Sequence, residues 1–276
     1  MKRVALPLLM ILLVGCIGTP SSPPTRCSGP TVSIATFNIQ IFGQAKMGDP
    51  EAVDSLVEIA TQFDIVAIQE IRDASEATVP RFISEINSRN HSYAYVISER
   101  LGSTSSKEQY AFVYNTKTIS FENASYLVND TVFERPPFAA KFRAGGFDFF
   151  LVNTHVKPEK GRTASEITAL AGAVTEDEDY IILGDFNADC SYLDEETLSS
   201  LLPGLEIIVS NEDDTTVGAS DCTYDRIAIT PRTREDYSSY GVYLFDKELG
   251  LDSTQAKSVS DHYPVYAEFY ISCDSD

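Results

Sequence analysis

Two short polar stretches, far apart in the chain, carry side chains that could hydrolyse a bond. Asp185 and Asn187 follow the apolar run 181–183, and Asp261 and His262 stand directly before another apolar run. Carboxylate, amide and imidazole groups at strand ends are held by a rigid sheet, which is how metal ligands and a general base are presented to a substrate. Together the two stretches predict a site that cleaves phosphodiester bonds.

Further polar side chains stand where other apolar β runs end. Asn38 follows the first such run, Glu70 the second, and His155 a later one. One polar group at a strand end is more often solvated or paired inside the core than catalytic. Polar groups at the ends of several strands, however, favour a single shared site.

The elements that must position these groups are mixed α and β. Apolar or alternating runs predict strands at 31–37, 65–68, 93–97, 110–114, 138–142, 147–154, 180–183, 206–209, 224–229 and 264–271. Helical spacing predicts helices after Asp49-Pro50, around 81–87, and from a capping box at Thr163 and Glu166 towards Val174. Long strands with few helices favour an α+β fold, a four-layer sandwich of two packed mixed sheets flanked by helices.

The start of the chain predicts export. A positively charged start precedes an apolar run too short to span a bilayer comfortably. Leu13-Val14-Gly15-Cys16 resembles a lipobox, so we expect residues 1–15 to be a signal and Cys16 to carry a lipid anchor; an ordinary signal cleaved nearby is the alternative. Residues 16–30 predict a Pro/Ser-rich tether. Residues 31–276 are then one extracellular, cell-surface domain.

Net charge bears on the substrate. The 276 residues carry a formal charge of -20, whereas nucleic-acid-binding proteins usually present a basic surface. The charge argues against stable DNA binding, but it does not exclude fast turnover with bound cations.

Export also changes how the cysteines are interpreted. Besides Cys16, the chain has Cys27, Cys190, Cys222 and Cys273, and three pairings are possible. Their positions favour Cys27–Cys273 and Cys190–Cys222, with the other two pairings left open.

The motifs, in their order along the chain, resemble the endonuclease/exonuclease/phosphatase superfamily, and within it most closely the deoxyribonuclease I group. The residues that carry this resemblance are Phe37-Asn38, Gln69-Glu70-Ile71-Arg72-Asp73, Lys107-Glu108-Gln109-Tyr110, Asn153-Thr154-His155, Gly184-Asp185-Phe186-Asn187-Ala188, Tyr224-Asp225-Arg226-Ile227 and Ser260-Asp261-His262-Tyr263-Pro264. The resemblance implies the four-layer fold, with the site at one edge of the sheets.

The same resemblance implies roles for individual residues. It makes Glu70 the principal ligand of Mg²⁺ or Mn²⁺, with Asn38, Asp185, Asn187 and Asp261 around the metal and the scissile phosphate. It makes His262, paired with Asp225, and His155, paired with Glu108, the proton-transfer groups. Which histidine is the base, and whether one metal or two act, stay open.

Two structural features also follow from the resemblance. Cys190 and Cys222 match the family's disulfide. Asp214 and Thr216 resemble a calcium-binding segment, although acidic turns are usually only solvated loops.

The chain departs from the deoxyribonuclease I pattern where that group contacts DNA. An arginine and a tyrosine are replaced by the segment 102–106, Gly-Ser-Thr-Ser-Ser. The minor-groove arginine is kept as Arg72, and Arg135 is a candidate phosphate contact in a reversed Arg-Glu pair. A locally basic segment contains Lys157, Lys160 and Arg162, and we expect it to attract the DNA backbone. The alternative is that it is only a solvated loop.

The leading interpretation is a monomeric, exported, metal-dependent endonuclease that hydrolyses DNA to 5′-phosphate ends. One alternative keeps the chemistry but acts on sphingomyelin or inositol phosphates, as relatives in the superfamily do. Another is a non-catalytic surface-binding module on the same scaffold, which would require a lost catalytic group. Activity on plasmid DNA, RNA, sphingomyelin and inositol phosphates, with and without chelator, separates the three.

Overall fold

The computed structural model describes residues 27–103, 106–126 and 131–272. The expected signal, the expected lipidation site Cys16 and most of the expected tether lie outside these residues, as does Cys273 of the expected Cys27–Cys273 pair. Within the described ranges no helix combines the length and the apolar character needed to cross a bilayer.

Strands and helices follow in mixed order, as the sequence predicts. In chain order they are β1 (Thr31–Phe42), α1 (Gln44–Met47), α2 (Pro50–Ala60), β2 (Ile65–Ile71), α3 (Thr78–Ser88), β3 (Tyr93–Ile97), β4 (Gln109–Asn115), β5 (Ser120–Tyr126), β6 (Phe138–Ala144), β7 (Phe147–His155), α4 (Arg162–Ala171), β8 (Tyr180–Asp185), η1 (Glu195–Thr197), α5 (Leu198–Leu201), β9 (Glu206–Ile207), β10 (Asp225–Ile229), η2 (Thr233–Glu235), β11 (Tyr237–Val242), α6 (Phe245–Glu248), α7 (Ser253–Val259) and β12 (Val265–Tyr270).

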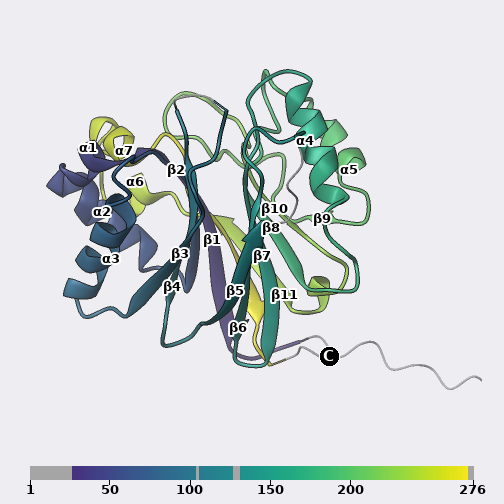
Figure 1. Cartoon of the computed structure of the whole chain (residues 1–276), viewed down its shortest axis with the longest axis horizontal. Helices are drawn as coiled ribbons and strands as arrows, with labels where there is room; N and C mark the ends of the chain where they lie inside the picture. The colour runs from purple at the N-terminus through teal and green to yellow at the C-terminus, as the bar shows by residue number, and fades with distance from the viewer. Residues whose placement is uncertain (1–26, 104–105, 127–130, 273–276) are drawn as a thin grey trace, which may run out of the picture.

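The strands form two six-stranded sheets, in the orders β11-β12-β1-β2-β4-β3 and β5-β6-β7-β8-β10-β9. The pairs β1–β2 and β7–β8 are parallel, whereas the other ladders are antiparallel. Figure 1 shows the sheets face to face, with α1, α2, α3, α6 and α7 on one outer side and α4 and α5 on the other. The expected four-layer sandwich is confirmed.

Three hydrophobic clusters explain why the central strands are apolar along their whole length. In β8, Ile181 and Leu183 point into the cluster between the sheets, while Ile182 packs into the cluster beneath α4 and α5. In β1, Ile34 joins the cluster between the sheets and Phe37 joins the cluster beneath the other helices. A strand covered on both faces must be apolar at successive positions, so polar residues are left to its ends.

Of the two helix starts predicted from capping residues, one is confirmed and one is wrong. Asp49 caps α2 by accepting from the backbone N–H groups of Glu51 and Ala52, as predicted. The predicted capping box of α4 is wrong, because the N-cap is Gly161 and Glu166 is buried instead. Its carboxylate accepts from the N–H groups of Glu134 at 3.0 Å and Lys157 at 3.1 Å, so it ties two loops together.

The topology brings the polar strand ends to one edge of the molecule. The parallel ladders end together, and the antiparallel neighbours β10 and β12 begin there. In the second sheet Asp185 is the register partner of both His155 and Asp225. In the first sheet Thr36, two residues before Asn38, pairs with Val265, three residues after His262.

Candidate active site at the sheet edges

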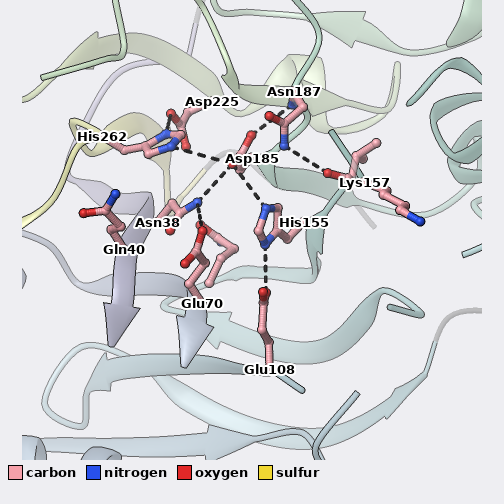
Figure 2. Close-up of polar contacts among 12 residues, drawn as sticks. Asn38, Gln40, Glu70, Glu108, His155, Lys157, Asp185, Asn187, Asp225 and His262 are labelled. Atoms are coloured by element: carbon pink, nitrogen blue, oxygen red, sulfur yellow. Dashed lines mark hydrogen bonds and ion pairs between the residues drawn. The ribbon is translucent and has the colours of Figure 1, made fainter. Parts of the chain in front are cut away.

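The Asp185 carboxylate lies at the centre of the polar cluster. Its Oδ2 atom accepts from Asn38 Nδ2 at 3.0 Å and lies 3.4 Å from Nε2 of His155 and 3.8 Å from Nε2 of His262. Figure 2 shows the two imidazoles approaching this carboxylate from different elements, with Glu70 below Asn38. Both sheets therefore contribute to one site.

His262 is held by a buried carboxylate. Its Nδ1 atom lies 2.7 Å from Oδ2 of Asp225, a residue with no exposed surface. Burial by itself would lower the pKa of His262, but the charges of Asp225, Asp185 and Asp261, with the hydrogen bond to Asp225, outweigh burial and raise that pKa to about 10. The pair leaves Nε2 directed at Asp185, and the Nδ1 hydrogen bond orients the ring.

His155 is held differently, because its carboxylate partner is shared. Nδ1 of His155 lies 2.9 Å from Oε2 of Glu108, whose Oε1 contacts Arg72 at 2.8 Å and Arg135 at 3.3 Å. Burial raises the pKa of Glu108, but the hydrogen bond and charge of His155 and the charges of the two arginines outweigh burial and lower it to about 2. Glu108 is thus an anion paired with two guanidinium groups and one imidazole.

Strained backbone presents some of these groups. Glu70, Asn187 and Ile41 adopt φ angles of 58°, 48° and 53°, a region that non-glycine residues seldom occupy. The ladders of β2 are irregular next to Glu70, which turns this side chain out of the sheet. Such outliers cluster at functional sites because the surrounding contacts hold them there.

Gly184 is required by a close backbone approach. A Cβ atom at this position would lie 1.9 Å from the carbonyl oxygen of Thr154 in the adjacent strand β7, and φ is +152°. Only glycine allows Asp185 to follow in register beside His155.

The residues around Glu70 suit a hard divalent cation. The Oδ1 atom of Asn38 is buried and has no hydrogen-bond partner in the described part of the chain, while its Nδ2 lies 3.4 Å from Oε1 of Glu70. An unsatisfied buried oxygen beside a carboxylate is the donor set that magnesium prefers. Asp261 lies at the rim, where its Oδ2 accepts from Gln40 Nε2 at 2.5 Å.

Asn187 contacts the site through its backbone. Its N–H donates to Oδ1 of Asp185 at 2.9 Å, and its side-chain amide donates to the Val156 carbonyl at 2.9 Å. The side chain therefore ties the loops after β7 and β8 together beside the two histidines.

The expected calcium segment is held together internally. Oδ1 of Asp214 accepts from the backbone N–H of Thr216 at 2.9 Å and from its hydroxyl at 2.7 Å. Both residues line a hollow of about 560 Å³ together with Asp213 and Asp246. Calcium binding there stays a prediction.

The expected DNA-contacting cations are already paired to different degrees. Arg72 is partly exposed and bonds Glu70 and Glu108. Arg135 is only 9% exposed, and besides Glu108 it bonds the carbonyl of His155 at 3.0 Å, so its guanidinium faces the protein.

In the basic segment 157–162, two of the three cations pair with nearby glutamates. Lys157 Nζ lies 2.9 Å from Glu159 and 3.9 Å from Glu134, and Arg162 lies 3.7 Å from Glu166. Lys160 is exposed and has no ion pair within the described residues.

Cys190 and Cys222 form a disulfide, as expected. It joins the loop after β8 to the segment before β10, and so links the residues that follow Asp185 to those that precede Asp225. The Cys27–Cys273 pairing stays a prediction.

Sequence reasoning missed several residues that hold the site. Ser260 donates to the carbonyl of Asn38 at 2.6 Å and accepts from the N–H of Gln40 at 3.2 Å, which ties β12's leading loop to β1. Lys46 of α1 donates to the Val259 carbonyl at 2.5 Å; burial lowers its pKa to about 8, although the charges of nearby Asp261 and Glu70 oppose this. A serine directly before Asp-His is a usable signal, whereas nothing local marks Lys46.

Comparison with known proteins agrees with this geometry. The model of the Endonuclease/Exonuclease/phosphatase family matches residues 35–262. Deoxyribonuclease-1 of Gallus gallus is 34% identical over 259 residues, covering 85% of this chain and 91% of that protein. Deoxyribonuclease gamma of Rattus norvegicus is 35% identical over 263 residues, covering 85% and 83%, respectively.

Solved structures share the fold at lower identity. A family protein from Bacteroides thetaiotaomicron superposes with a TM-score of 0.64 at 17% identity, covering 87% of this chain and 97% of that chain. D. rerio TDP2 complexed with a single-strand DNA product superposes with a TM-score of 0.63 at 16% identity, covering 87% and 99%.

Proposed function

The chain belongs to the endonuclease/exonuclease/phosphatase family, and we propose that it is a metal-dependent endonuclease that hydrolyses DNA phosphodiester bonds to 5′-phosphate ends. Relatives named deoxyribonucleases, 34–35% identical over most of their length, support DNA as the substrate. The serine-rich segment and the acidic composition do not favour tight binding, so we expect turnover rather than stable complexes.

The convergence of two histidines on one carboxylate carries this proposal. Nε2 of His155 and Nε2 of His262 lie 3.4 and 3.8 Å from Oδ2 of Asp185, and each ring is held at Nδ1 by another carboxylate. Two imidazoles directed at one position suit a reaction in which one proton leaves a water and another reaches the leaving oxygen.

Each residue then has a role at a stated atom. Nε2 of His262, in the neutral form of the ring, takes the proton of the attacking water, while Asp225 holds the ring and stabilises the cation that forms. Nε2 of His155 assists the phosphate or the leaving oxygen, and Asp185 and Asn187 orient the reacting groups between the rings. Glu108 holds the His155 ring.

Glu70 would be the principal ligand of Mg²⁺ or Mn²⁺, and Asn38 and Asp261 would complete the protein's share of the donor set. Bound there, the cation would neutralise charge that develops on the phosphate. Arg72, next to Glu70, would contact the substrate. Calcium at Asp214 and Thr216 would stabilise the loop before β10.

Plasmid nicking by the full-length protein tests the proposal. We expect Mg²⁺ or Mn²⁺ to support conversion of supercoiled plasmid to open circles, chelator to abolish it, and DNA ligase to reseal the nicks without a kinase. His262→Ala should lose activity, while His91→Ala, an exposed histidine outside the site, should keep it. Persistent nicking in His262→Ala, or hydrolysis of sphingomyelin or inositol phosphates in place of DNA, contradicts the proposal.

We also propose export with a lipid anchor at Cys16, and a monomeric enzyme on the cell surface. The Cys190–Cys222 disulfide supports an oxidising compartment. Metabolic labelling with a radioactive fatty acid should label the protein, and Cys16→Ser should abolish the label. Light scattering of the purified protein should give the monomer mass.

A further inference from the structure

Ile41 is an exposed apolar residue next to Glu70, the proposed metal ligand. Within the described ranges the exposed large hydrophobic residues are Ile41, at 57%, and Phe121, at 37%. Phe121, on β5 at the edge of its sheet, packs against Tyr114 of β4 and Phe142 of β6, whereas Ile41 lies near the end of β1. The backbone N–H of Ile41 donates to Oε2 of Glu70 at 3.0 Å.

Ile41 is also held in an unfavourable conformation. Its φ of 53° is a genuine outlier for a β-branched side chain, which normally excludes this region. The residues on either side prevent relaxation, because Gln40 donates from its N–H to Ser260 and the Phe42 carbonyl accepts from the N–H of Arg72 at 2.8 Å. A Cβ at Gly43 would lie 2.8 Å from the carbonyl of Arg72, so the turn is packed closely against β2.

The same Glu70 oxygen also contacts Arg72. Oε2 lies 3.0 Å from the Ile41 nitrogen and 3.1 Å from Nη2 of Arg72. An exposed aliphatic side chain and a partly exposed guanidinium therefore flank the proposed metal ligand. Glycine or asparagine would adopt this backbone with less strain and would keep the N–H bond, so the backbone contacts alone do not account for an isoleucine at this position.

We propose that Ile41 is a substrate-contacting residue that packs against the sugar and base edge of the nucleotide beside the scissile phosphate. The inference rests on the proposed nuclease function, since a DNA strand places apolar sugar faces and base edges close to each phosphate. Arg72 supplies the charge on the other side of Glu70. Apolar side chains beside arginine are a recurring means of contacting the minor groove.

Two variants separate the side chain from the backbone. Ile41→Gly and Ile41→Asn both keep the N–H that donates to Glu70, and both tolerate a positive φ. We expect the KM for duplex DNA to rise about fivefold to tenfold in both variants, because the apolar contact is lost. The kcat for bis(p-nitrophenyl) phosphate, which carries neither a sugar nor a base, should stay unchanged, because both variants keep the N–H bond to Glu70.

Controls distinguish the possible failures. Phe121→Ala, which removes the other exposed hydrophobic side chain, should leave the KM for duplex DNA unchanged, and thermal melting should show the Ile41 variants to be at least as stable as wild type. An unchanged KM for DNA overturns the inference, as does an equal loss on DNA and on the small substrate, which would mean that Ile41 only positions Glu70. If wild type itself cleaves no DNA, the proposed function fails instead.

Discussion

Nδ1 of His262 lies 2.7 Å from Oδ2 of Asp225, and within the described residues no lysine or arginine pairs with that carboxylate. His155 pairs with Glu108, which Arg72 and Arg135 also contact. Because Glu108 also neutralises the two arginines, it stabilises a positive charge on His155 less than Asp225 stabilises a positive charge on His262. The two histidine–carboxylate pairs are therefore unequal.

Asp225→Asn tests the first pair. The amide keeps the shape of the side chain but removes the charge and can hold the wrong tautomer of His262, so kcat for plasmid nicking should fall by on the order of 10³ to 10⁴ with little change in KM. Steady-state kinetics measure this. Asp177→Asn, an exposed carboxylate in the loop before β8, is the control, and a fall of less than tenfold in Asp225→Asn would contradict the role.

Glu108→Gln tests the second pair through the pH dependence of stability. The pKa of Glu108 in the folded protein is lowered to about 2 from an ordinary 4.5, so its stabilisation is present above about pH 4.5 and is lost as pH falls towards 2. The variant should be less stable than wild type by about 3 kcal/mol near neutral pH, from the size of that shift.

This difference in stability should shrink on acidification. Urea unfolding at pH 7, 5 and 3 measures it, with Glu159→Gln, an exposed carboxylate, as the control. A difference that stays constant across these pH values would show that the loss comes from packing and hydrogen bonding rather than from charge.

The basic segment is expected to attract the DNA backbone. Replacing Lys157, Lys160 and Arg162 with glutamine should raise the KM for duplex DNA about tenfold at low salt and flatten its dependence on salt, because fewer counterions are released. Lys117→Gln, in the turn after β4 at the opposite end of the sheet, is the control and should change neither quantity.

The reverse change tests the internal ion pairs. Because Glu159 lies 2.9 Å from Lys157, Glu159→Gln should release this cation and lower the KM by about twofold. If the triple variant leaves both the KM and its salt dependence unchanged, the segment is only a solvated loop.

Gly184→Ala adds a single methyl group, yet it should strongly lower the free energy of unfolding. The added methyl group would lie 1.9 Å from the Thr154 carbonyl, so β7 and β8 must separate, at a cost of about 3–5 kcal/mol. Gly172→Ala at the end of α4 is the matched control, since its φ is −75° and its nearest atom lies 3.8 Å away. Thermal unfolding measures both, and equal melting temperatures would contradict the register described here.

The sequence by itself determined the layers of the fold and the polar strand ends. Ile181, Ile182 and Leu183 in succession require cover on both faces of β8, and the carboxylate that follows them must lie outside the core. These are short-range patterns, since the period of a strand and the residues at its end are set by neighbours in the chain. The motif order then implied which side chains would meet.

Only the tertiary structure decided how they meet. Asn38 bonds Asp185 across 147 positions, and this contact depends on how two sheets pack. The same packing buried Arg135 against Glu108 and turned Glu166 from the expected cap into a tie between loops. These partners are selected by sheet register and close packing, which depend on the contacts of many residues far apart in the sequence. A local sequence pattern does not contain that information.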